Sequence, residues 1–289
     1  MRRSVLMPVL GVLAACIMPL AASAGSGGAA TQSHPAVAQA SSFNLGGAKC
    51  SLIGVPAADG KLPVGVGSCP GIRPGGELHS DIGMCTLNFL FEAPDHERFI
   101  GTAGHCILGE GPIADRAGEK LWPKGQGSVV KDGDGKRIGE FAYAVLQDPK
   151  DFGLIRLDPG VESNPEMCDF GGPNGINEDM SGDPTVLHYF GNGVGIGQTL
   201  PARSAVALGL PNPDHVFAAG LALPGDSGSA VISEDGRAVG VLVTVGVHGF
   251  GIDENGGIDF GTVGITRIAP QLARASQALG IKLTMVYVK

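Results

Sequence analysis

The sequence predicts an all-β fold: two blocks of short strands that form a pair of small barrels, followed by one C-terminal α-helix. Composition supports this, because glycine accounts for 48 of the 289 residues and charged residues for only 17%. Glycine at more than twice its usual share of about 7% favours many tight turns. The apolar residues also stand in runs of roughly 4 to 8, each bounded by Gly, Pro, Asp or Asn, which is typical of β-strands.

The predicted strands fall into two blocks, separated by the turn-rich stretch 158–184. The first block contains the runs 85–91, 98–102, 127–130, 137–145 and 152–157. The second block contains the runs 185–190, 204–208, 215–219, 230–233, 238–245 and 261–268. Only 270–280 is predicted to be a helix, with Pro270 at its start and Gly280 at its end. One face of this helix carries the apolar residues Leu272, Ala275 and Leu279.

The first 24 residues have the pattern of a secretory signal peptide. Two arginines precede an apolar run to Ala24 that ends in small residues. A membrane anchor is the alternative, which two prolines and the Gly/Ser/Ala-rich sequence after Ala24 disfavour. The segment 13–16 also resembles a lipoprotein cleavage box, but the apolar run continues past Cys16. We therefore expect a secreted, extracellular protein without a stable membrane span, and rank a lipid anchor on Cys16 second.

Composition divides the chain into four segments. Residues 1–24 are the predicted signal peptide, and residues 25–70, rich in Gly, Ala and Ser, are predicted to be a flexible leader or a pro-segment. The first barrel is expected over 71–160. The second barrel, together with the helix, is expected over 161–289.

Export determines how the cysteines are interpreted. Without Cys16, five remain as candidates for disulfides in an oxidising compartment: Cys50, Cys69, Cys85, Cys106 and Cys168. No pair has the C-x-x-C spacing of a zinc knuckle, so neither a metal nor another cofactor is predicted. The net charge of −8 and a sequence without any Lys/Arg cluster disfavour nucleic acid as a partner.

Three stretches carry side chains that could do chemistry together. In GTAGHC, 101–106, His105 is a structural histidine, a metal ligand or a catalytic base held by a nearby disulfide. In PGDSGSA, 224–230, glycines on both sides of Ser227 favour a turn that exposes its hydroxyl. In DFGLIRL, Asp151 opens an apolar strand and could be buried against an imidazole. A serine nucleophile needs a base, and the base needs an anion, so His105, Asp151 and Ser227 form a candidate catalytic triad.

In this order the three motifs resemble those of the chymotrypsin/trypsin-type serine proteases, and most of all the bacterial secreted, streptogrisin-like branch. The similarity covers about 82–281. It implies two antiparallel six-stranded β-barrels with the site in the cleft between them. It also implies an oxyanion hole made by the backbone N–H groups of Gly225 and Ser227, and a disulfide between Cys85 and Cys106.

The resemblance further implies where a substrate side chain binds. The base of the specificity pocket falls at Leu221, six residues before the nucleophile, and one wall is formed by Thr244, Val245 and Gly246. No acidic residue stands at that base to pair with Arg or Lys. An unpaired charge buried there would be costly, so we expect a preference for apolar side chains.

The sequence departs from the family pattern in several places, one of which is the absence of the cysteine pair that often brackets the nucleophile. Ser229 and Ala230 replace the last glycine of the nucleophile motif, and no Arg-Ile-Val-Gly-Gly activation site precedes the first barrel. Asp226 is nevertheless present, the residue that pairs with the newly cut N-terminus in animal members of the family. A buried carboxylate needs a partner. In the bacterial branch of the family an internal arginine supplies this charge, so the resemblance implies Arg203 as the partner, with His188 as the second candidate.

The sequence thus predicts a secreted serine endopeptidase that acts on proteins or peptides as a monomer. Two alternatives remain: a catalytically silent homologue that serves in binding or adhesion, and an esterase that uses the same triad. The intact triad disfavours the silent homologue, since such copies usually lose one of the three residues. A comparison of peptide and ester hydrolysis would separate the esterase from the endopeptidase.

Overall fold

The computed structural model describes residues 71–109, 118–168, 170–178, 185–194, 200–209, 213–245, 251–252, 258–259 and 261–288. The predicted signal peptide 1–24, the leader 25–70 and Gly246 of the predicted pocket lie outside these residues. Over the part of the chain that is described, no helix is both long and apolar enough to cross a membrane.

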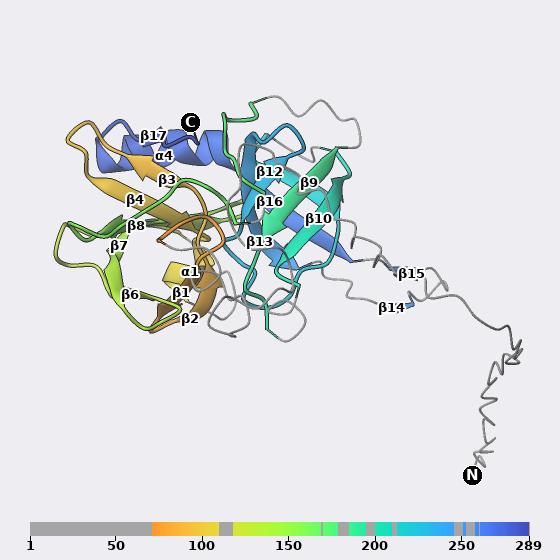
Figure 1. Cartoon of the computed structure of the whole chain (residues 1–289), viewed down its shortest axis with the longest axis horizontal. Helices are drawn as coiled ribbons and strands as arrows, with labels where there is room; N and C mark the ends of the chain where they lie inside the picture. Colours follow the sequence, from red (N-terminus) through yellow and green to blue (C-terminus); the bar gives the residue numbers. More distant parts are fainter. Residues whose placement is uncertain are drawn as a thin grey trace, which may run out of the picture. The chain divides into compact units, whose positions relative to one another are not determined.

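The first group of strands forms a nine-stranded sheet in which all neighbouring strands are antiparallel (Figure 1). Its order is β17-β3-β4-β8-β7-β6-β1-β2, and β5 also pairs with β7. The strands are β1 (Glu77–Ser80), β2 (Gly83–Thr86), β3 (Leu90–Glu92), β4 (Arg98–Thr102), β5 (Gly118–Leu121), β6 (Val129–Asp132), β7 (Arg137–Gln147), β8 (Lys150–Leu157) and β17 (Thr284–Met285). Its core is rich in aromatic rings, all of them buried: Phe89, Phe91, Phe99, Phe141, Tyr143 and Phe152.

The second group forms a closed barrel of six strands in the order β10-β11-β16-β13-β12-β9 (Figure 1). These strands are β9 (Val186–Phe190), β10 (Ala202–Ala207), β11 (His215–Ala219), β12 (Ala230–Ser233), β13 (Ala238–Val245) and β16 (Thr262–Arg267). A separate two-stranded sheet contains β14 (Gly251–Ile252) and β15 (Ile258–Asp259). Alternation with a period of two is clear in β10, where Ala205 and Ala207 are buried and Val206 between them is exposed.

These groups confirm a mostly β chain with one closed six-stranded barrel, a second sheet and a C-terminal helix. In the first sheet, the described strands follow a path of eight, and β5 pairs with β7 beside this path. The predicted run 85–91 is divided between β2 and β3. In addition, β17 returns from the C-terminal end of the chain to pair with β3, which places Met285 opposite Phe91.

Helix α4 (Ile268–Leu279) begins two residues before the predicted Pro270. Pro270 is therefore in the first turn, where its missing N–H has no intrahelical partner to lose. Gly280 ends the helix as predicted, with φ of 66°, and its N–H group is bonded to the carbonyls of Ser276 and Gln277. The buried face packs Ile268 and Ala275 into the core.

The segment from β2 towards β3 joins the two groups of strands. Thr86 N–H donates to the carbonyl of Ser227 at 2.9 Å, and the Thr86 hydroxyl donates to the carbonyl of Gly225 at 2.8 Å. Asn88 Nδ2 donates to the carbonyl of Gly228 at 3.1 Å. These bonds fix the loop between β11 and β12 against the first sheet, and this loop carries the predicted nucleophile.

Candidate active site

His105 and Asp151 form a hydrogen-bonded pair at the start of helix α1 (His105–Leu108). Asp151 Oδ2 lies 2.7 Å from His105 Nδ1, and Asp151 Oδ1 accepts a bond of 2.9 Å from the His105 backbone N–H. The two residues are 46 positions apart in the chain, and the pairing of β4 with β8, which sets Thr102 opposite Gly153, brings them together. Asp151 is only 8% exposed, so little water screens its charge.

Two glycines permit this close approach. A Cβ on Gly104, just before His105, would lie 2.0 Å from the carbonyl oxygen of Val145 in β7. A Cβ on Gly153 in β8 would lie 2.5 Å from the side chain of Ile107. The small residues around His105 therefore allow α1 to pack directly on the strands that carry its carboxylate partner.

Ser227 stands on a tight turn between β11 and β12. The turn is closed by a 3.0 Å bond from the N–H of Ser229 to the carbonyl of Asp226. Gly228, the residue after Ser227, has φ of +94°, and a Cβ there would lie 2.2 Å from the carbonyl oxygen of Thr86. Only glycine fits at this position, so the turn that the sequence predicts is required by both backbone conformation and space.

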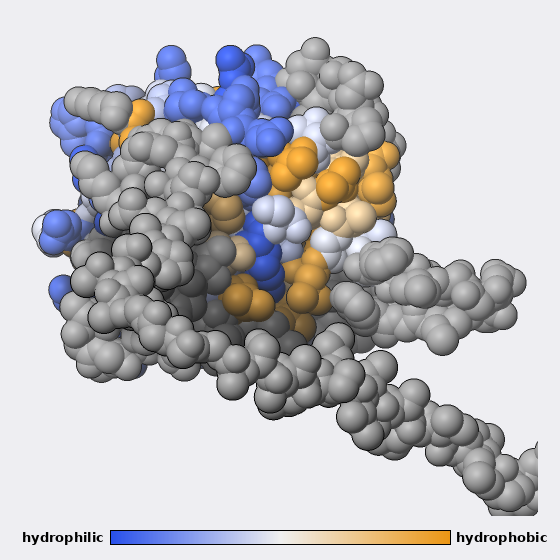
Figure 2. Space-filling model, turned by 45° about the vertical axis from the view of Figure 1, so that its right-hand side comes forward, coloured by the Kyte–Doolittle hydropathy of each residue, from blue (hydrophilic) through white to orange (hydrophobic). Residues whose placement is uncertain are grey.

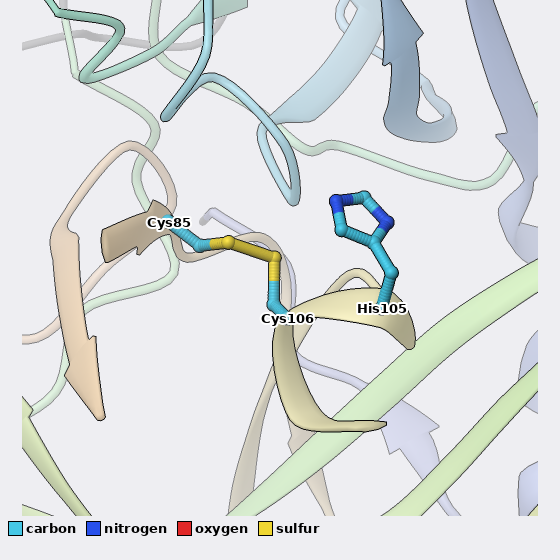
Figure 3. Close-up of side chains that lie close together, drawn as sticks. All are labelled: Cys85, His105 and Cys106. Atoms are coloured by element: carbon cyan, nitrogen blue, oxygen red, sulfur yellow. A yellow bond between two sulfur atoms is a disulfide. The ribbon is translucent and has the colours of Figure 1, made fainter. Parts of the chain in front are cut away.

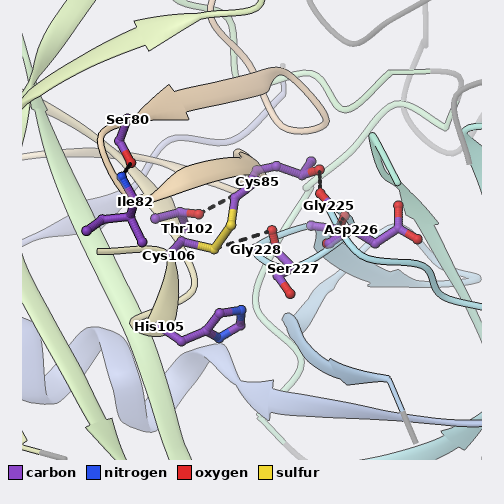
Figure 4. The surroundings of a disulfide bond; sticks show 12 residues. Ser80, Ile82, Cys85, Thr102, His105, Cys106, Gly225, Asp226, Ser227 and Gly228 are labelled. Atoms are coloured by element: carbon purple, nitrogen blue, oxygen red, sulfur yellow. Dashed lines mark hydrogen bonds between the residues drawn. A yellow bond between two sulfur atoms is a disulfide. The ribbon is translucent and has the colours of Figure 1, made fainter. Parts of the chain in front are cut away.

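The turn of Ser227 and helix α1 meet at the predicted disulfide Cys85–Cys106, which the structure confirms with an S–S distance of 2.02 Å. The Sγ of Cys106 lies 3.8 Å from the carbonyl oxygen of Ser227. Figure 4 shows the cystine between the Ser227 turn and α1, with the Ser227 side chain directed towards the side on which the His105 imidazole lies. The residue after His105 therefore touches the residue that the sequence predicts as nucleophile.

Within the described residues, no hydrogen bond yet joins the Ser227 hydroxyl to His105 Nε2. Catalytic hydrogen bonds are often long in ligand-free structures and tighten when a substrate is bound. The Nδ1 side of the imidazole, by contrast, is already fixed by Asp151 at 2.7 Å. Asp151 thus occupies Nδ1, and Nε2 is the ring nitrogen that it does not contact.

The cluster of Cys85, His105 and Cys106, whose sulfur and nitrogen atoms lie within 4.8 Å of one another, has the spacing of a metal site (Figure 3). Its chemistry does not fit one, because a metal binds the thiolate and both sulfurs here are joined to each other. Of the readings of GTAGHC that the sequence left open, this excludes the metal site and shows that the cysteine beside His105 is half of a disulfide. Cys168 is also disulfide-bonded.

The backbone N–H groups of Gly225 and Ser227, the predicted oxyanion hole, donate to no other group among the described residues. The two peptide groups that carry them are held from the carbonyl side. The Pro224 carbonyl accepts a 2.9 Å bond from the N–H of Val194, and the Asp226 carbonyl accepts bonds from Ser229. Two neighbouring N–H groups without an acceptor in the described part of the chain are what an oxyanion hole requires.

Asp226 is fully buried and pairs with Arg203, which confirms the first of the two predicted partners. Arg203 binds both carboxylate oxygens: its Nη2 donates to Oδ1, and its Nη1 donates to Oδ2 at 2.6 Å. The N–H groups of Gly193 and Leu223 complete the shell, each at 2.7 Å. The carboxylate thus has a fixed charge partner within the chain, and it anchors the nucleophile loop to β10.

His188, the second candidate, lies elsewhere. Its Nδ1 is 2.8 Å from the hydroxyl of Ser204, and its ring stacks on Phe170 with 5.0 Å between centroids. Burial lowers the pKa of His188. Tyr189, the next residue, lies below the Arg203 guanidinium at 5.3 Å from its ring centroid, and burial raises the pKa of its phenol to about 12.

The predicted pocket is described only in part. Leu221 is 36% exposed, and its carbonyl accepts a hydrogen bond from the hydroxyl of Tyr189. Thr244 and Val245 belong to β13, where they pair with Gly264 and Val263 in β16. Three other apolar side chains are also exposed on and beside β10 and β11, with 42–59% of their surface accessible: Val206, Leu208 and Phe217. Figure 2 shows hydrophobic residues gathered on one part of the described surface, beside a hydrophilic part.

Sequence reasoning missed two residues at the site, Thr86 and Ser229. Thr86 gave no local signal, because its role comes from pairing with a loop 139 residues later. Ser229 was visible as a departure from the family pattern, but its contacts could not be read from the sequence. Both are fully buried polar residues whose hydroxyls bond to carbonyls of the nucleophile loop, at Gly225 and Asp226 respectively.

Comparison with known proteins gives matches in structure alone. No protein-family model and no curated sequence matches the chain. Protease A of Thermobifida fusca is 18% identical with a TM-score of 0.49, over 74% of this chain and 99% of its own. Cellulomonas bogoriensis chymotrypsin is 17% identical with a TM-score of 0.46, over 74% and 99%. A glutamic-acid-specific serine protease is 15% identical with a TM-score of 0.48, over 74% and 100%.

Proposed function

We propose that the chain is a secreted serine endopeptidase that hydrolyses peptide bonds through Ser227, His105 and Asp151. One observation carries the proposal: the hydrogen-bonded pair of Asp151 and His105, 2.7 Å between Oδ2 and Nδ1, stands beside a tight turn that presents Ser227. Together these residues supply a nucleophile, a base and an anion that orients the base. The disulfide Cys85–Cys106 is consistent with an oxidising, extracellular location.

In this mechanism, the Ser227 hydroxyl attacks the peptide carbonyl while His105 Nε2 takes its proton. Asp151 accepts the Nδ1–H, so the imidazole keeps a lone pair on Nε2 and its positive charge is stabilised once the proton arrives. The same imidazole then gives the proton to the leaving amine. Water repeats the sequence on the acyl group held by Ser227, which releases the second product and restores the hydroxyl.

The developing oxyanion is bound by the N–H groups of Gly225 and Ser227. Such donors stabilise charge that forms only in the transition state, and they are already free of internal partners here. The ion pair of Arg203 with Asp226 keeps the loop that carries both donors in place. A new N-terminus is therefore not required to complete the hole.

The substrate side chain before the cleaved bond is proposed to be apolar. Leu221 stands at the predicted base of the pocket, with Thr244, Val245 and Gly246 along one wall. None of these residues bears a charge that could pair with Arg or Lys. A panel of peptides that differ only at this position tests the preference, and cleavage mainly after Arg, Lys or Glu would contradict it.

The activity is tested by labelling with a fluorophosphonate, which reacts with activated serines. We expect label on the peptide that contains Ser227 and hydrolysis of peptide substrates by the same preparation. Ser227→Ala should remove both, while Ser233→Ala, which alters a buried serine of β12 outside the site, should keep both. A folded wild-type protein that neither takes the label nor cleaves peptides would contradict the proposal.

A further inference from the structure

We propose that Ser229 is a positioning residue for the oxyanion hole: its hydroxyl sets the direction of the Ser227 N–H. The inference rests on the proposed function and names a residue outside the triad. Ser229 Oγ donates to the carbonyl oxygen of Asp226 at 2.6 Å, and the Ser229 N–H donates to the same oxygen at 3.0 Å. One carbonyl therefore receives two hydrogen bonds from a single residue.

This carbonyl and the Ser227 N–H belong to the same peptide group. The bond between Asp226 and Ser227 is trans, so its C=O and N–H point in opposite directions in one plane. Whatever holds the oxygen on one side holds the N–H on the other. The hydroxyl of Ser229 thus acts through the peptide plane on a donor that it does not touch.

The second donor of the hole is held in another way. The Gly225 N–H shares its peptide group with the Pro224 carbonyl, which is held by the backbone N–H of Val194 at 2.9 Å. No side chain takes part in that bond. Ser229 is therefore the place at which a side-chain change can alter one donor of the hole and leave the other as it is.

The surroundings of Ser229 keep its hydroxyl in this role. Ser229 is 0% exposed, so bulk water cannot replace its hydrogen bond. Hydrogen bonds in the protein interior are also stronger than in water. Space is also short, because a Cβ on Gly191 would lie 2.7 Å from Ser229 Oγ. The hydroxyl has little freedom to turn to another acceptor.

The test compares Ser229→Ala with Ser233→Ala. Both changes remove one buried hydroxyl, but that of Ser233 bonds to the Asp235 carboxylate and lies 3.2 Å from the Arg237 carbonyl, in the turn between β12 and β13. Rates are referred to active sites counted by titration with a burst substrate, so that loss of folded protein does not count as loss of catalysis. For Ser229→Ala we expect kcat to fall about tenfold with KM within twofold, the size of one hydrogen bond. Ser233→Ala should match the wild type.

A second measurement reports on the hole directly. A peptidyl trifluoromethyl ketone with a ¹³C-labelled carbonyl adds the Ser227 hydroxyl, and its hemiketal oxygen then occupies the hole. The carbon shift followed against pH gives the pKa of that oxygen. Ser229→Ala should make the hemiketal hydroxyl about tenfold less acidic, whereas a residue that only supports the fold would leave it unchanged.

The outcomes separate the inference from the proposed function. A wild-type protein that forms no hemiketal and takes no fluorophosphonate overturns both. An active wild type whose kcat and hemiketal pKa are reproduced by Ser229→Ala overturns the positioning role alone. A lower kcat and a less acidic hemiketal in Ser229→Ala, both absent from Ser233→Ala, support it.

Discussion

Two buried carboxylates of this chain are satisfied in different ways, and the difference matches their proposed roles. Asp151 receives both its hydrogen bonds from one residue, His105, whose imidazole can gain and lose a proton. Asp226 is surrounded by the permanently charged Arg203 and by two backbone N–H groups. In the proposed roles, Asp151 stabilises the imidazole when it takes up a proton, while Asp226 keeps a constant ion pair that fixes a loop.

Asp151→Asn should leave folding nearly intact and reduce kcat by about four orders of magnitude near neutral pH. The amide can favour the wrong tautomer of His105, which then presents N–H in place of a lone pair to Ser227. Asp148→Asn is the matched control, an exposed aspartate on the turn before β8, and should stay within twofold of the wild type. Steady-state kinetics on titrated enzyme measure both. The reverse pattern would assign the role to Asp148.

Arg203→Gln should lower kcat more than it raises KM, because it frees the loop that carries the oxyanion donors. It also leaves the Asp226 carboxylate buried without a counter-charge, which typically costs about 3–5 kcal/mol of unfolding free energy. Arg137→Gln removes an exposed ion pair, that with Asp158, and should leave the free energy of unfolding nearly unchanged. Urea unfolding gives the free energy of unfolding of both variants, and steady-state kinetics give their kcat and KM. An Arg203→Gln variant with the stability and kcat of the wild type would refute the role assigned to this pair.

At the scale of elements, the sequence predicted best what depends on neighbouring residues. The end of α4 at Gly280 and the turn at Ser227 follow from local rules about glycine, and both were found. The need of Asp226 for a partner followed from the cost of a buried charge, and the choice of an arginine followed from the family resemblance. The return of β17 to the first sheet could not be predicted, because Thr284 and Met285 carry no sign of partners about 190 residues earlier.

The disulfide Cys85–Cys106 links β2 to α1 and should stabilise both the fold and the site. It closes a loop of 21 residues, and the entropy model of cross-linking gives about 3 kcal/mol for that length. The free energy of unfolding of Cys85→Ala/Cys106→Ala should therefore be lower by about 3 kcal/mol, which moves its urea midpoint to a lower concentration. We also expect its kcat to fall, because the Ser227 carbonyl loses its contact with Cys106. Unfolding curves and rates unchanged from the wild type would contradict this.

At the scale of the whole molecule, two buried histidines make stability depend on pH. Burial lowers the pKa of His188 and of His215, against the weaker opposite effect of nearby carboxylates. The unfolded chain takes up protons below about pH 6.5, while the folded chain resists them, so the free energy of unfolding should fall as the pH drops from 7 to 5. Urea midpoints across this range measure the slope. His215→Gln should make it shallower, and an unchanged slope would exclude His215 as a contributor.

The internal pairing of Asp226 also bears on how the proposed protease becomes active. Since Arg203 already occupies the carboxylate, activity should not require a free amino group near Gly71. A form that begins at Ala48 keeps Cys50 and Cys69 as candidate partners of Cys168 and carries extra residues before Gly71, and it should be active without further trimming. Activity that appears only after the extra residues are trimmed, together with a harmless Arg203→Gln, would show that the N-terminus is needed.

The pairing of β17 with β3 ties the early part of the chain to its last residues. During synthesis, Thr284 and Met285 are added long after Phe91 and Glu92. Until then, the backbone groups of β3 that pair with β17 have no partner from that strand. A strand edge left bare in this way is a template for a second chain. A chain shortened before Thr284 should therefore aggregate more readily, because this strand edge stays uncovered. The edge of β3 is covered only in a chain that extends through Met285.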